Sequence, residues 1–150
     1  MKVRKAYNQI MASQSDKPSK AVITLGPVCI APGKCRRIPM SLNHRLHWMI
    51  RKKWNDAWKE EVGWLAKSNR IKNELNAKLP LIKAKITVQL FTIRKLDRDN
   101  SYTCSKAIID GLKGIILTDD DDEHLDLAVT QVKVGTRLEE HVELIIERIQ

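Results

Sequence analysis

The stretch LIKAKITVQLFTI, residues 81–93, alternates between apolar and polar side chains along most of its length. Successive side chains of a β-strand point to opposite faces of the sheet, so this alternation predicts one strand with one buried face. Lysine, threonine and glutamine at the intervening positions predict that the other face is exposed to solvent. The side chains predicted on the buried face are Ile82, Ala84, Ile86, Val88 and Leu90.

Upstream of this strand, the sequence predicts a strand, a loop and a long helix. Residues 21–30 are rich in β-branched side chains and predict a strand, whereas the prolines and glycine of residues 31–43 predict a loop. Apolar residues at steps of three and four over residues 44–77 predict one long helix, with Asn43 as its cap and Pro80 marking its end. Its predicted buried stripe is Ile50, Trp54, Trp58, Val62 and Leu65.

Downstream, residues 101–113 predict a second, shorter helix that Asn100 caps. Residues 125–134 and 141–149 predict two further strands, joined by a turn around Gly135. The predicted order is therefore β-α-β-α-β-β. This order favours a small single α+β domain, with a mixed or antiparallel sheet and two helices packed on one face.

The 150-residue length fits one domain with a sizeable core. Residues 1–19 lack periodicity, so we expect a flexible lead in front of a domain formed by residues 20–150. No apolar run approaches the roughly 18 to 20 residues of a membrane helix, and the basic, polar N-terminus lacks the apolar centre of a secretion signal. These features predict no membrane association and a cytoplasmic location.

The cysteines are few and odd in number, which predicts reduced thiols rather than a disulfide framework. They are Cys29, Cys35 and Cys104. Cys29 and Cys35, together with His44 and His47, do not have the spacing of a strong zinc site.

Charge is distributed unevenly along the chain. Residues 1–96 contain 21 Lys and Arg against 5 Asp and Glu, whereas residues 97–150 contain 6 against 13, within a formal net charge of +9. A basic part of this size suggests a polyanionic partner, although a solvated basic surface has the same composition.

The carboxylates gather in the second part. Asp97 and Asp99 follow the central predicted strand two positions apart, and extended chain would point both side chains to one face. Two adjacent carboxylates repel each other unless a proton or a cation lies between them. Magnesium prefers carboxylate and water oxygens, and a third carboxylate from the run at residues 119–122 would complete such a site. A solvated acidic surface is the alternative, and the run lacks the ligand spacing of an EF-hand.

Two other groups of polar residues accompany the acids. Lys106 and Asp110 are four apart on the second predicted helix, so they share a face, either as a salt bridge or with the lysine directed at a phosphate. A basic cluster lies at the start of the long helix, beside Trp48. It fits phosphate contacts with an aromatic ring available for stacking, and it equally fits a solvent-exposed basic helix face. The candidate DNA contacts are Asn43, Arg45, His47, Arg51, Lys52 and Lys53.

The segment LDRDNSYTCSKAIIDGLKGIILTDDDDEHLDLAVTQVKV, residues 96–134, resembles the core of the RusA-type Holliday junction resolvases. That family has Asp-x-Asp-Asn, a lysine on the next helix, an aspartate four residues later followed by a small residue and leucine, and an Asp-Asp pair before a strand. SLNHRLHW, residues 41–48, is similar to the segment before the first helix of phage-type members, so the resemblance spans about residues 41–134. The matching residues are Asp97, Asp99, Asn100, Lys106, Asp110, Gly111, Leu112, Asp119 and Asp120.

The resemblance implies a homodimeric endonuclease, encoded by a bacterium, prophage or phage, that uses Mg²⁺ or Mn²⁺ to cut four-way DNA junctions in recombination and repair. It implies that Asp97, Asp99 and Asp120 hold the metal and that Lys106 neutralises charge on the phosphate. Two more aspartates follow the pair, so Asp119 and Asp121 are alternates for the third ligand. A nuclease for other branched DNA and a non-catalytic junction- or DNA-binding protein are the alternative functions.

Overall fold

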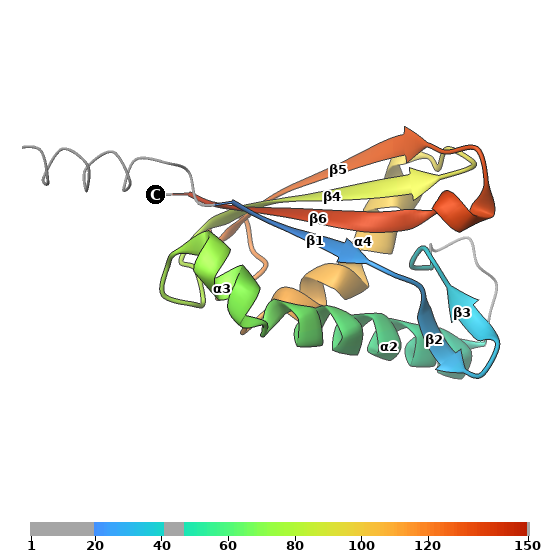
Figure 1. Cartoon of the computed structure of the whole chain (residues 1–150), viewed down its shortest axis with the longest axis horizontal. Helices are drawn as coiled ribbons and strands as arrows, with labels where there is room; N and C mark the ends of the chain where they lie inside the picture. The colour runs from blue at the N-terminus through green and yellow to red at the C-terminus, as the bar shows by residue number, and fades with distance from the viewer. Residues whose placement is uncertain (1–19, 41–46, 150) are drawn as a thin grey trace, which may run out of the picture.

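The computed structural model describes residues 20–40 and 47–149, and within them it is a small α+β domain. It contains a four-stranded mixed sheet, a separate two-stranded antiparallel sheet and helices, which confirms the predicted fold class (Figure 1). The strands are β1 (Lys20–Leu25), β2 (Val28–Ala31), β3 (Lys34–Arg36), β4 (Ala84–Thr92), β5 (Leu125–Lys133) and β6 (His141–Arg148). The helices are α2 (Trp48–Ala66), α3 (Asn69–Leu75), α4 (Arg98–Leu112) and the short 3-10 helix η1 (Arg137–Glu139).

The central strand is β4, as the alternating stretch predicts. The order in the sheet is β1-β6-β4-β5, and β4 pairs antiparallel with β6 and parallel with β5. Ala84, Ile86, Val88 and Leu90 are all fully buried. The prediction was wrong for Ile82, which is 84% exposed, because β4 begins only at Ala84.

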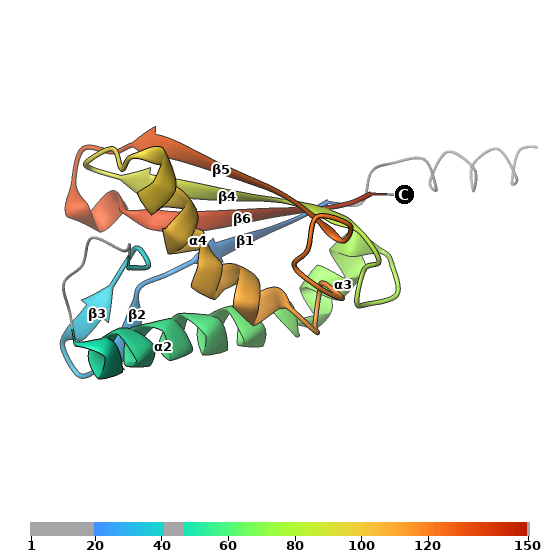
Figure 2. The ribbon, with the colours of Figure 1, turned by 180° about the vertical axis from the view of Figure 1, so that it is seen from behind.

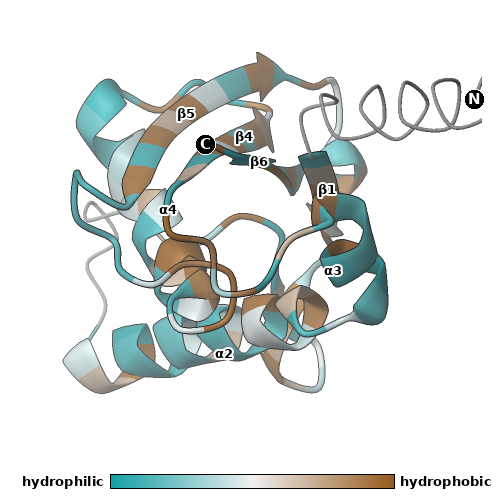
Figure 3. Cartoon of the chain, turned by 90° about the vertical axis from the view of Figure 1, so that its left-hand side faces the viewer, coloured by the Kyte–Doolittle hydropathy of each residue, from teal (hydrophilic) through white to brown (hydrophobic). Residues whose placement is uncertain are grey.

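All three α-helices of the described chain lie on the same side of the four-stranded sheet (Figures 1 and 2). Viewed from the end of the molecule in Figure 3, the sheet and the helical layer lie on opposite sides of the core. The parallel pairing of β4 and β5 requires a crossover, and α4 provides it. The end of β4, α4 and the start of β5 therefore form one β-α-β unit, which positions all the predicted acidic residues.

The single helix predicted over residues 44–77 is two helices. Ser68 ends the first and caps the second, because its hydroxyl accepts a hydrogen bond from the backbone N–H of Ile71. α3 ends at Asn76, whose left-handed backbone (φ 45°) is a usual helix terminus, so Pro80 does not mark the end. Within the predicted stripe, Trp54, Trp58 and Val62 are buried, but Leu65 is only partly buried and Ile50 is 43% exposed.

The region before α2 also differs from the prediction. The expected strand over residues 21–30 is broken after Leu25, where Gly26 and Pro27 interrupt the pairing, and the expected loop contains β3. β2 and β3 form a hairpin in which Cys29 lies directly opposite Cys35 with 4.0 Å between their Cα atoms, and a disulfide joins them. The prediction of reduced thiols is therefore wrong for this pair, and Cys104 is free and buried.

Some predictions fall on residues outside the described ranges. These are the flexible lead at residues 1–19 and the predicted DNA contacts Asn43 and Arg45. The prediction that Asn43 caps the long helix is wrong, because His47 is the N-cap of α2. No helix within residues 20–40 and 47–149 combines the length and apolar character that a bilayer span requires.

Candidate active site on helix α4

The first predicted carboxylate, Asp97, is the N-cap of α4. Its Oδ1 accepts the backbone N–H of Asn100 and its Oδ2 accepts the side-chain amide of the same residue, both at 2.8 Å. Asn100 was predicted to be the cap but lies inside the first turn, where it is buried. This asparagine fixes the Asp97 carboxylate on two sides, and each carboxylate oxygen retains a further lone pair for another partner.

The prediction of an extended Asp97–Asp99 segment was wrong. β4 ends at Thr92, and Asp99 lies in the first turn of α4 with an exposed side chain. Both carboxylates therefore sit at the N-terminus of a helix, where the unpaired N–H groups and the macrodipole favour negative charge.

A single face of α4 carries the polar residues of the predicted site. Asp99, Thr103, Lys106 and Asp110 follow one another at steps of four, three and four, which keeps them on the same side of a helix. The opposite side is buried against the sheet through residues such as Ile108. Lys106 is exposed and stands two turns, or about 10 Å of helix rise, from Asp99.

This face of α4 borders a cleft of about 570 Å³ that α2 closes from the other side. Three cations from the two helices, Arg51, Lys59 and Lys106, line it together with the carboxylates of Asp56 and Asp110. The cleft thus brings the predicted phosphate-directed lysine next to one of the predicted DNA contacts. The complete lining is Met40, Arg51, Asn55, Asp56, Lys59, Thr103, Lys106, Ala107 and Asp110.

The other predicted DNA contacts in the described chain lie outside this lining. Lys52 forms an ion pair with Asp56 one turn away, with Nζ and Oδ2 2.8 Å apart, and Lys53 is exposed. His47 is the N-cap of α2, because its Nδ1 accepts the backbone N–H of Met49 at 3.2 Å. Trp48 next to it is 68% exposed, so its indole ring is available for stacking.

The cleft continues along α2 and α4 into a second hollow of about 490 Å³. The two share Asp56, Lys59 and Asp110, and the second reaches Trp64 and Lys113 at the far end of α4. Trp64 is 72% exposed although it lies within a helix that buries Trp54 and Trp58. The result is a groove lined by both cations and carboxylates, including Glu60, with an exposed indole near one end.

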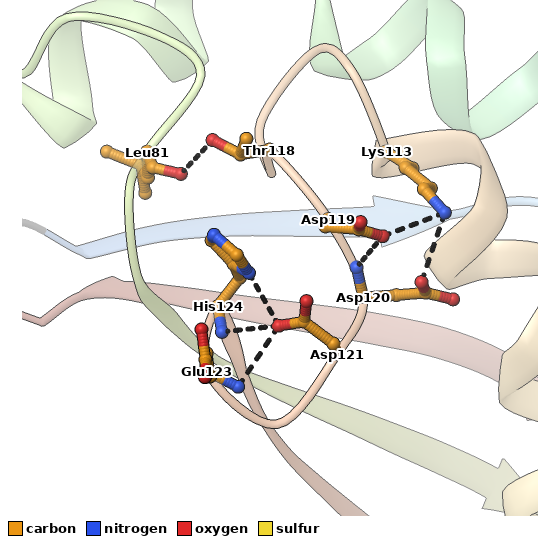
Figure 4. A network of polar contacts seen from close by, with 8 residues as sticks. All are labelled: Leu81, Lys113, Thr118, Asp119, Asp120, Asp121, Glu123 and His124. Carbon is orange, nitrogen blue, oxygen red and sulfur yellow. Dashed lines mark hydrogen bonds and ion pairs between the residues drawn. The ribbon is translucent and has the colours of Figure 1, made fainter.

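The acidic run forms the loop between α4 and β5 (Figure 4). Lys113, just after α4, binds Asp119 at 2.8 Å and Asp120 at 3.1 Å. The hydrogen bond from Lys113 lowers the pKa of Asp119 to about 2, and the same bonds raise the pKa of Lys113. Asp119 is therefore ionised at neutral pH.

Asp121 has a different role in this loop. Its carboxylate accepts hydrogen bonds from the backbone N–H groups of Glu123 and His124 and contacts the His124 ring (Figure 4). The bond with the His124 ring lowers the pKa of Asp121. Asp121 thus closes the turn into β5, which makes it the poorest of the three candidates for a metal ligand.

A single chain does not bring the three predicted metal ligands together. Asp97 and Asp99 lie at the N-terminal end of α4, whereas Asp119 and Asp120 are held by Lys113 at its C-terminal end. The helix between them has 15 residues, which corresponds to about 22 Å. Accordingly, no group of three His, Cys, Asp or Glu side chains within residues 20–40 and 47–149 is arranged to hold a metal ion.

Gln131, which the sequence analysis does not single out, holds the backbone just before Asp97. The side-chain amide of Gln131 on β5 accepts the backbone N–H of Leu96 at 2.8 Å and donates to its carbonyl oxygen at 2.9 Å. Leu96 immediately precedes Asp97. Gln131 therefore acts in place of a neighbouring strand and fixes the β4–α4 connection, and only the pairing of β5 with β4 reveals it.

We expect Gln131→Leu to lower the free energy of unfolding by about 1–3 kcal/mol, because both polar groups of the partly buried Leu96 backbone lose their partner. Urea denaturation is the measurement, with Thr130→Leu on the exposed neighbouring position as the control. Equal stability of the two variants would show that the Leu96 backbone finds other partners.

Comparison with known proteins adds no relative. No protein-family model matches the chain, and no curated protein sequence matches it significantly.

Proposed function

We propose that the protein is a metal-dependent, structure-specific DNA endonuclease that resolves four-way junctions, as the RusA-type resemblance implies. The observation that carries the proposal is the polar face of α4, where Asp99 and Lys106 lie on the same side of the helix. Lys106 also lines the cleft between α2 and α4, together with Arg51 and Lys59. A carboxylate for a metal and a cation for a phosphate thus lie on one face of the same helix, two turns apart.

The donor set fits a hard divalent cation in part. Asp97 and Asp99 offer carboxylate oxygens, and the two hydrogen bonds from Asn100 orient Asp97 without occupying all its lone pairs. Mg²⁺, with Mn²⁺ as the alternative, would polarise a phosphodiester and make a bound water more acidic. Lys106 would neutralise charge that develops on the phosphate. Arg51 and Lys59 would bind neighbouring phosphates of the backbone.

The third carboxylate of each site would come from a second copy of the chain. Because α4 separates Asp99 from Asp120 by most of its length, we propose a homodimer in which Asp120 of the partner subunit completes each site. Lys113 would then release Asp120 while keeping Asp119. A two-fold dimer has two such sites, which suits paired nicks in a junction whose strands are also related by a two-fold axis.

A non-catalytic DNA-binding protein is the second candidate. It is favoured by the same separation of the carboxylates, since the described part of one chain holds no three-ligand group. The groove would then bind DNA, and the acids would only stabilise the start of α4 and its C-terminal loop. A nuclease for other branched DNA would use the same residues and differ only in its substrate.

Cleavage of an end-labelled synthetic four-way junction tests these candidates, with linear duplex of the same sequence beside it. We expect symmetric nicks in the junction that require Mg²⁺ or Mn²⁺. Asp99→Asn should reduce the rate by about 10²–10³-fold, since a metal ligand supports several kcal/mol of transition-state stabilisation. Asp126→Asn, which removes an exposed carboxylate from β5, is the matched control and should cut normally.

Each other outcome selects a different function. Cutting of both substrates would indicate a general nuclease. Tight junction binding without cutting in either metal would establish the binding protein. Normal cutting by Asp99→Asn would contradict the proposed site even if the wild type resolves junctions.

A further inference from the structure

Four arginines from three separate segments line a hollow at the end of β4, near the start of α4. Arg36 ends β3 and Arg37 follows it, Arg94 follows β4, and Arg137 begins η1. They line two adjoining cavities of about 420 and 360 Å³ that share Arg36 and Arg137. Among the described residues, Glu140 is the one carboxylate in the lining of either cavity. We call this the arginine pocket.

Neutral groups orient two of these side chains. Arg37 donates to the carbonyl oxygen of Leu138 at 3.4 Å, and the Nε of Arg36 donates to that of Ile38 at 3.4 Å. The Arg36 guanidinium also lies 5.7 Å from the centre of the Trp54 ring. Each of these contacts orients a guanidinium.

The described residues that line the pocket include fewer acidic groups than arginines. Glu140 supplies a single carboxylate, and its Oε2 also accepts the backbone N–H of Ile93 at 3.5 Å. Cys104 lines the larger cavity, but burial raises the pKa of its thiol to about 11, so it is neutral at physiological pH. Burial also lowers the pKa of Arg36, which means that the cationic form is held at a cost. A bound anion would offset that cost.

The pocket lies next to the first residues of the candidate site. Leu96 lines it, and Leu96 is bonded to Gln131 and directly precedes the N-cap Asp97. An anion in the pocket would therefore lie beside the start of α4. Guanidinium groups match the oxygens of phosphate with paired hydrogen bonds, which a lysine cluster does not do.

We propose that the arginine pocket binds backbone phosphates of DNA next to the site at Asp97 and Asp99. The inference rests on the proposed function for the identity of the polymer, but not on cleavage. It adds a second contact region to the α2–α4 groove, so that the start of α4 lies between two places where the DNA backbone is held.

The test measures DNA binding without metal, so that no cutting occurs. Arg94→Gln/Arg137→Gln removes two exposed arginines of the pocket, and Lys72→Gln/Arg148→Gln removes two exposed cations of α3 and β6 at the other end of the sheet (Figure 1). Fluorescence anisotropy with a labelled four-way junction gives the Kd at several salt concentrations. We expect the pocket variant to bind about tenfold more weakly, with a salt slope less steep by about 2, since each lost phosphate contact removes about 0.9. The control variant should retain most of the affinity.

Three results would overturn the inference. The pocket variant and the control could show equal Kd values and equal salt slopes. Binding of a labelled poly-glutamate peptide could depend on the two arginines while binding of the junction does not. That result would assign the pocket to an acidic protein partner. Arginine Nε–H NMR signals of the wild type could stay unchanged on titration with inorganic phosphate, a readout that needs no variant to fold.

Failure of this inference differs from failure of the proposed function. Junction cutting by the wild type with arginine-independent binding would overturn the pocket alone. Arginine-dependent binding without cutting in Mg²⁺ or Mn²⁺ would overturn the nuclease and leave the pocket intact.

Discussion

Gly111→Ala is expected to lower the free energy of unfolding by about 3 kcal/mol, at the upper end of the usual cost of overpacking. A Cβ at this position would lie 2.7 Å from the backbone oxygen of Lys59 and 2.9 Å from the Cβ of Val62, both on α2. Neither atom is the end of a flexible side chain. The substitution therefore forces α2 and α4 apart along their whole contact.

Gly63→Ala is the matched control, since Gly63 lies on α2 in the same interface. A Cβ there would meet Ile115 and the backbone oxygen of Gly111 at 3.7 Å, which is ordinary van der Waals contact. Removal of a glycine from the interior of a helix should then raise stability by about 0.5–1 kcal/mol. Urea or thermal unfolding of both variants measures the difference, and equal effects of the same sign would contradict the tight crossing at Gly111.

The contact at Gly111 has a consequence for the groove. The distance between α2 and α4 sets how far Arg51 and Lys59 lie from Lys106. A stable variant with the helices further apart should bind DNA in the groove more weakly.

The second large effect is expected from mixing two inactive variants. If each site takes Asp99 from one chain and Asp120 from the other, then Asp99→Asn and Asp120→Asn should each lose at least about 100-fold in nicking rate. A mixed dimer places both substitutions in one site and leaves the other site intact. After unfolding and refolding together in equal amounts, about a quarter of the wild-type nicking rate should return, because half the dimers are mixed and each has one working site.

A second mixture provides the control. Asp97→Asn and Asp99→Asn damage the same half of the site, so their mixed dimer has no intact site and should recover nothing. Nicks are counted one strand at a time, because a single working site cannot make a paired cut. If neither mixture recovers activity while the wild type cuts, the sites are not shared between chains, and a rearranged loop would have to bring Asp120 to Asp99.

Local periodicity was sufficient for the α+β class and for the strands β4, β5 and β6. The alternation in residues 81–93 correctly predicted the central strand, since one face of β4 is buried over its whole length. The same reasoning confirmed β5 and β6 to within one residue of their bounds. It failed where a capping side chain decided the outcome, because Ser68 divides one apolar stripe into two helices and Asp97 starts α4 three residues before the predicted cap.

The sequence by itself determined the α+β class, the uneven distribution of charge and the shared helix face of Lys106 and Asp110, because these depend on residues close together in the chain. The tertiary structure alone decided that α4 keeps Asp99 and Asp120 apart, that Gln131 holds Leu96, and that arginines from three segments share a pocket. The order of strands in the sheet and the crossing of α2 over Gly111 create these arrangements. Each joins residues far apart in the chain, and packing between elements, which no local pattern encodes, brings them together or keeps them separate.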